Sequence, residues 1–132
     1  MINGVHLLLS SSNPEADRAF FRDALKFGYV DAGEGWLIFA LPPSEMGIHP
    51  AEKSITHPHA GKDIAAATVY LMCDNLRATL DSLASQGVEH GEIHDAGWGI
   101  ASSIPLPGGG NLGLYEPHHL LATTINELRE RA

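Results

Sequence analysis

Basic residues are scarce in this chain of 132 residues, which carries 8 lysines and arginines against 16 aspartates and glutamates. The formal net charge of −8 argues against a nucleic-acid-binding protein, because such proteins need clustered basic side chains to neutralise phosphates. A neutral or cationic small ligand would suit this balance, although solubility is the simpler explanation. Hydrophobic residues make up 44% of the chain, so a folded core is expected rather than disorder.

Cysteine and long apolar runs are also lacking. Cys73 is the single cysteine, so no internal disulfide can form, and its apolar surroundings predict a buried core thiol in a reducing cytoplasm. No apolar run is long enough to span a bilayer, and residues 1–9 lack the basic start of a signal peptide. We therefore expect a cytoplasmic protein without membrane contact, folded as one domain over residues 1–132.

The chain nearly repeats itself. Asn13 and Asn75 both follow a short apolar stretch and open a helical pattern, and they lie 62 residues apart. Trp36 and Trp98 each follow a glycine and are separated by the same 62 residues. Two copies of one unit predict a pseudo-twofold molecule, in which a pocket tends to form where the copies meet.

Periodicity predicts the same order of elements in both units. Unit 1, about residues 2–52, is expected to hold a helix and four strands: strand 4–10, helix 14–26, then strands 29–32, 36–41 and 46–49. A linker follows at about 53–65. Unit 2, about 66–118, is expected to hold strand 67–73, helix 76–86, then strands 88–94, 98–106 and 111–116. A helix without a counterpart is expected at about 119–131.

The fold class predicted from this order is α+β. Two tandem βαβββ units would form a curved, cup-shaped mixed sheet with the helices outside, followed by the C-terminal helix. In the expected first strand of unit 2, Val69, Leu71 and Cys73 should face the helix, while Tyr70 and Met72 should face the cup. The concave wall of the cup is where a functional site is expected.

This tandem pattern resembles the vicinal oxygen chelate superfamily, which includes glyoxalase I, extradiol dioxygenases and bleomycin-resistance proteins. The resemblance is carried by Val5-His6-Leu7-Leu8-Leu9 with Asn13-Pro14-Glu15-Ala16-Asp17, by Tyr70-Leu71-Met72-Cys73-Asp74-Asn75-Leu76, and by Pro107-Gly108-Gly109-Gly110-Asn111-Leu112-Gly113-Leu114-Tyr115-Glu116-Pro117. It covers about residues 2–118. The resemblance implies a fold more than an activity, since this superfamily supports many chemistries on one scaffold.

Metalloenzymes of the superfamily hold one divalent ion with His and Glu side chains from the first and last strand of each unit. Transferred to this sequence, the four positions are His6, Gly47, Thr68 and Gly113. Only His6 is a good ligand, so the quartet is not intact and no cofactor is expected. Because side chains two apart on a strand share a face, a displaced divalent-metal site using His6 and His49, with Tyr115 nearby, is the alternative.

The residues expected to line the cup are those whose side chains should point inward from their strands, together with the two equivalent tryptophans. They are His6, Leu8, Trp36, His49, Thr68, Tyr70, Met72, Trp98 and Tyr115. The tryptophans could equally be core or rim residues. No catalytic residue can be assigned, because no Ser-His-Asp or Cys-His arrangement is evident and Cys73 should face the helix.

Three functions remain open at this point. The first is a small-molecule-binding protein of the bleomycin-resistance type, with a cup, no metal and an acidic cleft that would suit a cationic ligand. The second is a metal-dependent lyase, isomerase or dioxygenase that uses His6 and His49. The third is an interaction module with a vestigial pocket. The resemblance also implies a homodimer, with the cup formed either within one chain or across two.

Overall fold

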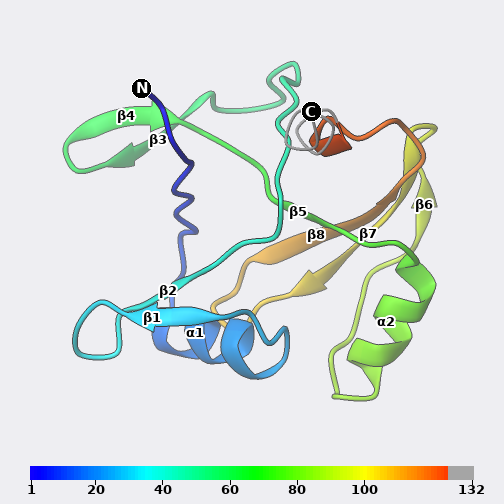
Figure 1. Ribbon diagram of the computed structural model, residues 1–132, viewed down its shortest axis with the longest axis horizontal. Helices are drawn as coiled ribbons and strands as arrows, with labels where there is room; N and C mark the ends of the chain where they lie inside the picture. Colours follow the sequence, from blue (N-terminus) through cyan, green and yellow to red (C-terminus); the bar gives the residue numbers. More distant parts are fainter. Residues whose placement is uncertain (125–132) are drawn as a thin grey trace.

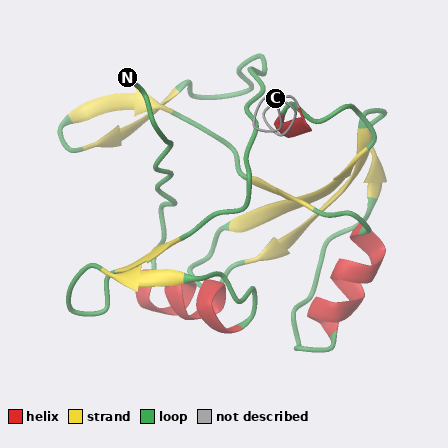
Figure 2. Ribbon diagram, in the orientation of Figure 1, coloured by secondary structure: helices red, strands yellow, loops and turns green. Residues whose placement is uncertain are grey.

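The computed structural model describes residues 1–124 of the chain (Figure 1). Helices α1 and α2, a short helical segment at 123–124 and eight strands in three separate sheets lie within these residues (Figure 2). The elements in chain order are α1 (Pro14–Asp23), β1 (Tyr29–Asp31), β2 (Leu37–Phe39), β3 (Thr56–His59), β4 (Lys62–Ala65), β5 (Tyr70–Met72), α2 (Leu76–Ala84), β6 (His94–Asp95), β7 (Gly99–Pro105) and β8 (Asn111–Pro117). The α+β class predicted from the sequence is confirmed.

Both helices begin at the asparagines that mark the repeat. The Asn13 side chain accepts a hydrogen bond from Ala16 N at 3.2 Å, and that of Asn75 accepts one from Ala78 N at 3.0 Å. Such caps satisfy backbone N–H groups that have no partner within the helix. The repeat is therefore present in the structure at the start of each helix.

A second repeated feature precedes each tryptophan. Asp31 Oδ1 accepts a hydrogen bond from Gly33 N, and Asp95 Oδ1 accepts one from Gly97 N, both at 2.8 Å. Each aspartate thus forms the same side-chain-stabilised turn, which reverses the chain toward Trp36 or Trp98.

The four-stranded sheet of the second half has the order β5-β8-β7-β6. β5 runs parallel to β8, and the other neighbours are antiparallel, so the sheet is mixed. Its helix-facing side packs on α2 through the core, which consists of Phe21, Leu76, Leu80, Leu83, Ile104, Leu112 and Leu114. All of these except Phe21 belong to the second half, so the core is centred there. Figure 1 shows this sheet beside α2, with α1 next to the β1–β2 pair.

The first half differs from the prediction of a complete βαβββ unit. β1 and β2 pair as expected, but no strand forms at 4–10 or at 46–49. The equivalent segments of the second half are β5 and β8, which pair with each other, and β8 also pairs with β7. A strand is stable only when its backbone groups find partners and one face is covered, and these two segments are exposed. The two-unit cup is thus not closed within the chain.

Two further predictions of local structure were wrong. The expected linker contains the β3–β4 hairpin, because Ala60 and Gly61 both adopt positive φ, which a tight two-residue hairpin turn requires. The strand expected at 88–94 is reduced to β6, although Gly91 N still donates a hydrogen bond to Ser103 O at 2.9 Å. The helix expected at 119–131 falls mostly on residues 125–132, outside the described residues.

The N-terminus of α1 is fastened to the loop between β7 and β8. Gly108 N donates a hydrogen bond to Asp17 Oδ1 at 2.7 Å, and Asp17 is buried. Ser12 N also donates to Gly108 O at 3.2 Å, and the Ser12 hydroxyl contacts the same carbonyl. A Cβ atom on Gly108 would collide with Ser11 and Asp17, so glycine is required there. This clasp joins residues 91 apart in sequence and fixes α1 against the second half.

No helix among residues 1–124 combines the length and the apolar character needed to cross a membrane.

Candidate binding site

The sheet face opposite α2 is the open face, and strand register defines its residues. Tyr70 pairs with Gly113, which pairs with Ser103 on the next strand. One row further along β8, Tyr115 pairs with Ala101, which pairs with His94. Small residues therefore form the middle of the open face, and larger side chains stand at its edges.

A cavity of about 510 Å³ lies on this face. It is lined by strand residues and by the end of the N-terminal segment: Leu9, Ser10, Ala67, Thr68, Val69, Tyr70, Glu92, His94, Ser102, Ser103, Leu106, Gly110, Asn111, Leu112 and Gly113. The lining mixes apolar side chains with hydroxyl, amide, imidazole and carboxylate groups. The volume falls in the range of small-molecule sites, and the hollow is widely open to solvent.

Tyr70 and Gly113 shape the cavity together. A Cβ atom on Gly113 would lie 2.8 Å from Tyr70 Cγ and would meet the edge of the ring as well. The tyrosine ring therefore covers the position from which any side chain of residue 113 would rise. Glycine at 113 is a steric requirement of this tyrosine, since Cγ cannot move away without a change of rotamer.

An aromatic cluster adjoins the cavity at Tyr70. The ring of Tyr115 lies edge-on to Tyr70 at 5.7 Å and to Trp98 at 5.2 Å between ring centroids. Its hydroxyl donates a hydrogen bond to Glu45 Oε1 at 3.3 Å, and Ala122 N donates to Glu45 Oε2 at 2.8 Å. Burial, and then the nearby Glu45 carboxylate, raise the pKa of the Tyr115 phenol, which keeps it protonated as a donor.

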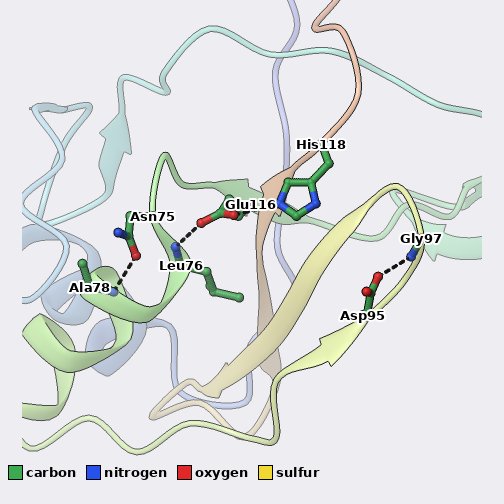
Figure 3. Close-up of polar contacts among 7 residues, drawn as sticks. All are labelled: Asn75, Leu76, Ala78, Asp95, Gly97, Glu116 and His118. Carbon is green, nitrogen blue, oxygen red and sulfur yellow. Dashed lines mark hydrogen bonds and ion pairs between the residues drawn. The ribbon is translucent and has the colours of Figure 1, made fainter.

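Glu116 lies on the α2 side of β8, beside Leu76 and His118 (Figure 3). Its Oε1 atom accepts a hydrogen bond from Leu76 N at 3.0 Å, and its Oε2 atom lies 2.8 Å from His118 Nε2. The bonds from His118 and from the helix N-terminus lower the pKa of this carboxyl. Glu116 therefore holds the start of α2 against the end of β8 and is not a group of the binding site.

Comparison with known proteins identified structural neighbours but no close relatives. No family model and no curated protein matches the sequence. The structure is similar to an antibiotic binding protein from Streptomyces sp. CB03234, with a TM-score of 0.59 and 20% identity over 88% of this chain and 97% of that one. Lactoylglutathione lyase from Agrobacterium tumefaciens matches with a TM-score of 0.55 and 18% identity over 86% and 92%. A glyoxalase family protein from Bacillus anthracis gives 0.56 and 16% over 89% and 97%.

The chain has the vicinal oxygen chelate fold. Among the residues expected to line the cup of this fold, Thr68 and Tyr70 line the cavity. Met72 lies on the same face as Tyr70, and Tyr115 and Trp98 form the adjoining aromatic cluster. The structure thus brings together the expected residues of the second half.

The expected residues of the first half do not reach this cavity. His6, Leu8 and His49 lie in exposed segments outside any strand, and His49 Nδ1 contacts the carbonyl of Pro50 at 2.7 Å. Trp36 is 56% exposed and carries the guanidinium of Arg18 over its ring, 4.4 Å from the centroid. That arrangement is a surface cation–π contact.

The four positions that hold the metal ion in metalloenzymes of the vicinal oxygen chelate fold do not bring metal-ligating side chains together in this chain. Thr68 and Gly113 line the cavity, but Gly113 has no side chain and the Tyr70 ring covers it. His6 and Gly47 lie in the open first half. Within residues 1–124, no three or more His, Cys, Asp or Glu side chains come close enough together to hold an ion. The residues present therefore do not fit the ion that this fold binds in its metalloenzymes.

Cys73 packs against the core, on the helix side of β5. Burial raises the pKa of its thiol, which disfavours the reactive thiolate. The sequence-based expectation that this cysteine faces the helix agrees with the structure.

The polar residues of the cavity lining that the sequence analysis missed include Glu92, His94, Ser102, Ser103 and Asn111. Ser103 and Asn111 could have been found, because alternation along β7 and β8 places them on the face of Gly113. Glu92 and His94 lie two apart in the strand predicted at 88–94, so alternation places them on one face, but the sequence analysis did not decide which face of that strand points into the cup.

Lowering the pH should weaken the hydrogen bond that Glu116 accepts from the first residue of α2. Its pKa is lowered from the ordinary 4.5 in the folded chain, so its stabilising contribution is present above pH 4.5 and is lost as the pH falls through the folded-state value. We expect wild type to exceed Glu116→Gln in free energy of unfolding near pH 7, with the difference shrinking below pH 4.5. Urea denaturation across this range measures it. The exposed Glu89→Gln serves as control, and an equal pH trend in both variants would contradict the assignment.

Proposed function

We propose that this chain binds a small organic molecule in the open-face cavity, without a metal ion at the quartet positions of the fold. The observation that carries the proposal is the cavity itself, about 510 Å³ of space with mixed polar and apolar lining. The Tyr70 ring supports the metal-free part, because it covers the position where a ligand from residue 113 would stand. The similarity to an antibiotic binding protein agrees with a binding role.

The metal-dependent alternative has less support. The lactoylglutathione lyase shares the fold at 18% identity, which carries no activity across. His6 and His49 lie in exposed segments that share no strand pairing with the cavity-forming sheet. We therefore favour a receptor over a lyase, isomerase or dioxygenase.

Blocking the cavity should abolish binding. We expect at least one compound from a panel of fused-ring molecules, screened as cations, neutral species and anions, to raise the melting temperature by about 5 °C at a hundredfold excess over Kd. Ser103→Trp should remove this stabilisation, because the indole would stand in the middle of the open face. The matched control is Ser85→Trp at the exposed end of α2. Failure of every compound, or an equal shift in Ser103→Trp, would contradict the proposed function.

We further propose that two copies associate through the first half. The accessible surface of the chain is 10064 Å², whereas a folded monomer of 14.1 kDa exposes about 6,700 Å². The first half contributes most of the exposed large apolar side chains, including Val5, Val30, Trp36, Met46 and Ile48. The excess is about 3,300 Å² per chain, or about 6,600 Å² for two copies, which lies at or above the upper end of the areas that obligate interfaces bury. The unpaired segments 4–10 and 46–49 would gain strand partners there.

Sedimentation equilibrium should report a dimer of this 14.1 kDa chain. Ile48→Asp should raise the dimer dissociation constant by about tenfold or more, because a charge would be buried in the interface. Ser85→Asp adds the same charge on α2 and should leave the dissociation constant unchanged. A wild-type monomer at all concentrations would show that the first half is not an interface.

A further inference from the structure

We propose that the open-face cavity also supports a slow esterase reaction, in which Ser10 is the nucleophile and His57 is the general base. This inference adds a reaction to the proposed function and rests on the uptake of a small organic molecule by the same cavity. Three observations carry it: the contact between the two side chains, its difference from the other serine and histidine contacts, and the place of Ser10 on the cavity wall.

Folding brings Ser10 and His57 together from positions 47 residues apart in the sequence. Ser10 lies at the end of the N-terminal segment, whereas His57 lies in β3, where it pairs with Ile64 of β4. The distance from Ser10 Oγ to His57 Nε2 is 3.0 Å, which is within reach for an imidazole to take the proton of a serine hydroxyl. No sequence motif marks this pair, so only the structure reveals it.

This contact differs from the other hydrogen bonds of serine and histidine side chains within residues 1–124. The other serine hydroxyls with hydrogen bonds contact only backbone groups, which cannot act as a general base. The other histidine hydrogen bonds join residues no more than four apart in the sequence. Ser10 is therefore the serine to which the fold brings a base.

Ser10 lines the cavity, whereas His57 lies outside the lining. A carbonyl carbon bound in the cavity would therefore meet the hydroxyl, and the imidazole would remain free to hold the proton. Both side chains are exposed, so a substrate can approach them without a rearrangement of the chain. Ser10 also lies two residues after Leu8, so strand pairing of this segment in a dimer would keep both side chains on one face.

Hydrogen-bond donors for the oxygen of a reacting carbonyl lie in the same cavity. The Thr68 hydroxyl and the Asn111 side-chain amide belong to residues of its lining, which contains no lysine or arginine. The carbonyl oxygen takes up negative charge when the hydroxyl attacks, and donors around it lower the energy of the intermediate. Neutral donors would provide this stabilisation here.

The reaction converts a carboxylic ester and water into an acid and an alcohol. Ser10 Oγ attacks the carbonyl carbon while its proton passes to His57 Nε2. The bond from this carbon to the alcohol oxygen then breaks, and the imidazolium returns the proton to the departing oxygen, which leaves an acyl group on Ser10. Water attacks the acyl group and gives a proton to His57, and Ser10 Oγ departs with that proton.

The pair lacks the carboxylate of a complete triad. No carboxylate forms a hydrogen bond or an ion pair with His57 in the part of the chain that the structure describes. In a triad the carboxylate orients the imidazole and stabilises its charged form, and its loss lowers kcat about 10⁴-fold. We therefore expect activated esters, such as p-nitrophenyl butyrate, to react, and amides not to react.

Hydrolysis of p-nitrophenyl butyrate by the full-length chain tests the pair, with the released nitrophenolate measured by absorbance. Ser10→Ala and His57→Ala should each lower the rate about tenfold or more, because they remove the nucleophile and its base. The matched controls are His59→Ala, two residues further along β3, and Ser85→Ala, an exposed serine bonded to a backbone carbonyl. Both controls should leave the rate unchanged, and thermal unfolding checks that every variant is folded.

Mass spectrometry of the quenched reaction identifies the nucleophile directly. The butyryl group should be found on the peptide that contains Ser10, in the wild type and in His59→Ala, and should fall about tenfold or more in His57→Ala. Ser10→Cys should again become acylated, since a thiol is the stronger nucleophile. A butyryl group found only on another residue, or equal hydrolysis by the wild type and Ser10→Ala, would overturn the inference.

The outcomes separate this inference from the function on which it rests. If compounds of the fused-ring panel bind and Ser103→Trp removes their binding, but Ser10 is not acylated, the receptor function holds and the esterase inference fails. If Ser10 is acylated equally in the wild type and in Ser103→Trp, the ester reacts from solvent and not from the cavity, which also overturns the inference. If no compound binds and Ser10 is not acylated, both proposals fail.

Discussion

Asp17→Ala should lower the free energy of unfolding by about 2–3 kcal/mol, the largest effect expected for a single polar side chain in this protein. Asp17 is buried, and its carboxylate accepts the hydrogen bond from Gly108 N. Its removal would leave a buried N–H group without a partner and would release α1 from the β7–β8 loop. Urea denaturation at neutral pH measures the loss.

Two companion variants isolate the clasp from the general effect of charge on the helix. Glu15 is the other acidic residue in the first turn of α1, so Glu15→Ala loses the same favourable interaction with the helix dipole, about 0.5 kcal/mol. Asp17→Asn keeps an oxygen acceptor for Gly108 N and should retain most of the stability. A loss in Asp17→Ala no greater than that in Glu15→Ala would show that the clasp contributes nothing.

Gly113→Ala should destabilise the chain by about 1–3 kcal/mol, the cost of forcing an extra carbon into packed space. The new Cβ atom would collide with the Tyr70 ring, which lies across the glycine. The same collision would prevent a metal-ligating side chain at this position from reaching the cavity. Thermal and urea unfolding of the variant measure the effect.

A double-mutant cycle identifies Tyr70 as the cause. In a Tyr70→Ala background, Gly113→Ala should cost less than about 0.5 kcal/mol, because the ring that it meets is gone. If Gly113→Ala is equally costly with and without the ring, strain in the β8 backbone is responsible instead. The cycle therefore tests the steric account of the lost ligand directly.

The parts of the fold that were predictable from the sequence depend on local signals. Asn13 with Pro14 marks a helix start in the sequence, and so does Asn75, because capping is decided within a few residues. β7 and β8 were also predictable, since they pair with each other across the short Pro107–Gly110 turn. Nothing about these elements requires knowledge of distant parts of the chain.

The parts that were not predictable depend on partners. The segments at 4–10 and 46–49 have the apolar composition of strands, yet a strand forms only where another strand accepts its hydrogen bonds. Sequence repetition could show that these segments match β5 and β8, but not that their partners would be missing from the single chain. The β3–β4 hairpin was overlooked for the opposite reason, because Pro58 and the charged residues around it read as a linker.

The residues of the candidate site likewise divide into those that the sequence predicted and those that it did not. Tyr70 was expected at the cavity because of strand alternation, and Thr68 because it occupies a metal position of the resembled superfamily. The sequence showed that Gly113 cannot supply a metal ligand, because glycine has no side chain. The structure adds that the Tyr70 ring occupies the space that a side chain at this position would need. Glu92 was missed because the sequence analysis assigned no inward face to the strand that it predicted at 88–94.

The uneven distribution of the core between the two copies of the repeat has an evolutionary consequence. Most fully buried side chains belong to the second copy, so amino-acid replacements there are constrained by packing. The first copy buries few side chains within its own chain, so replacements there should act mainly on the proposed contact between two copies. The two copies of the repeat should therefore place different limits on substitution: internal packing in the second copy and contact between chains in the first.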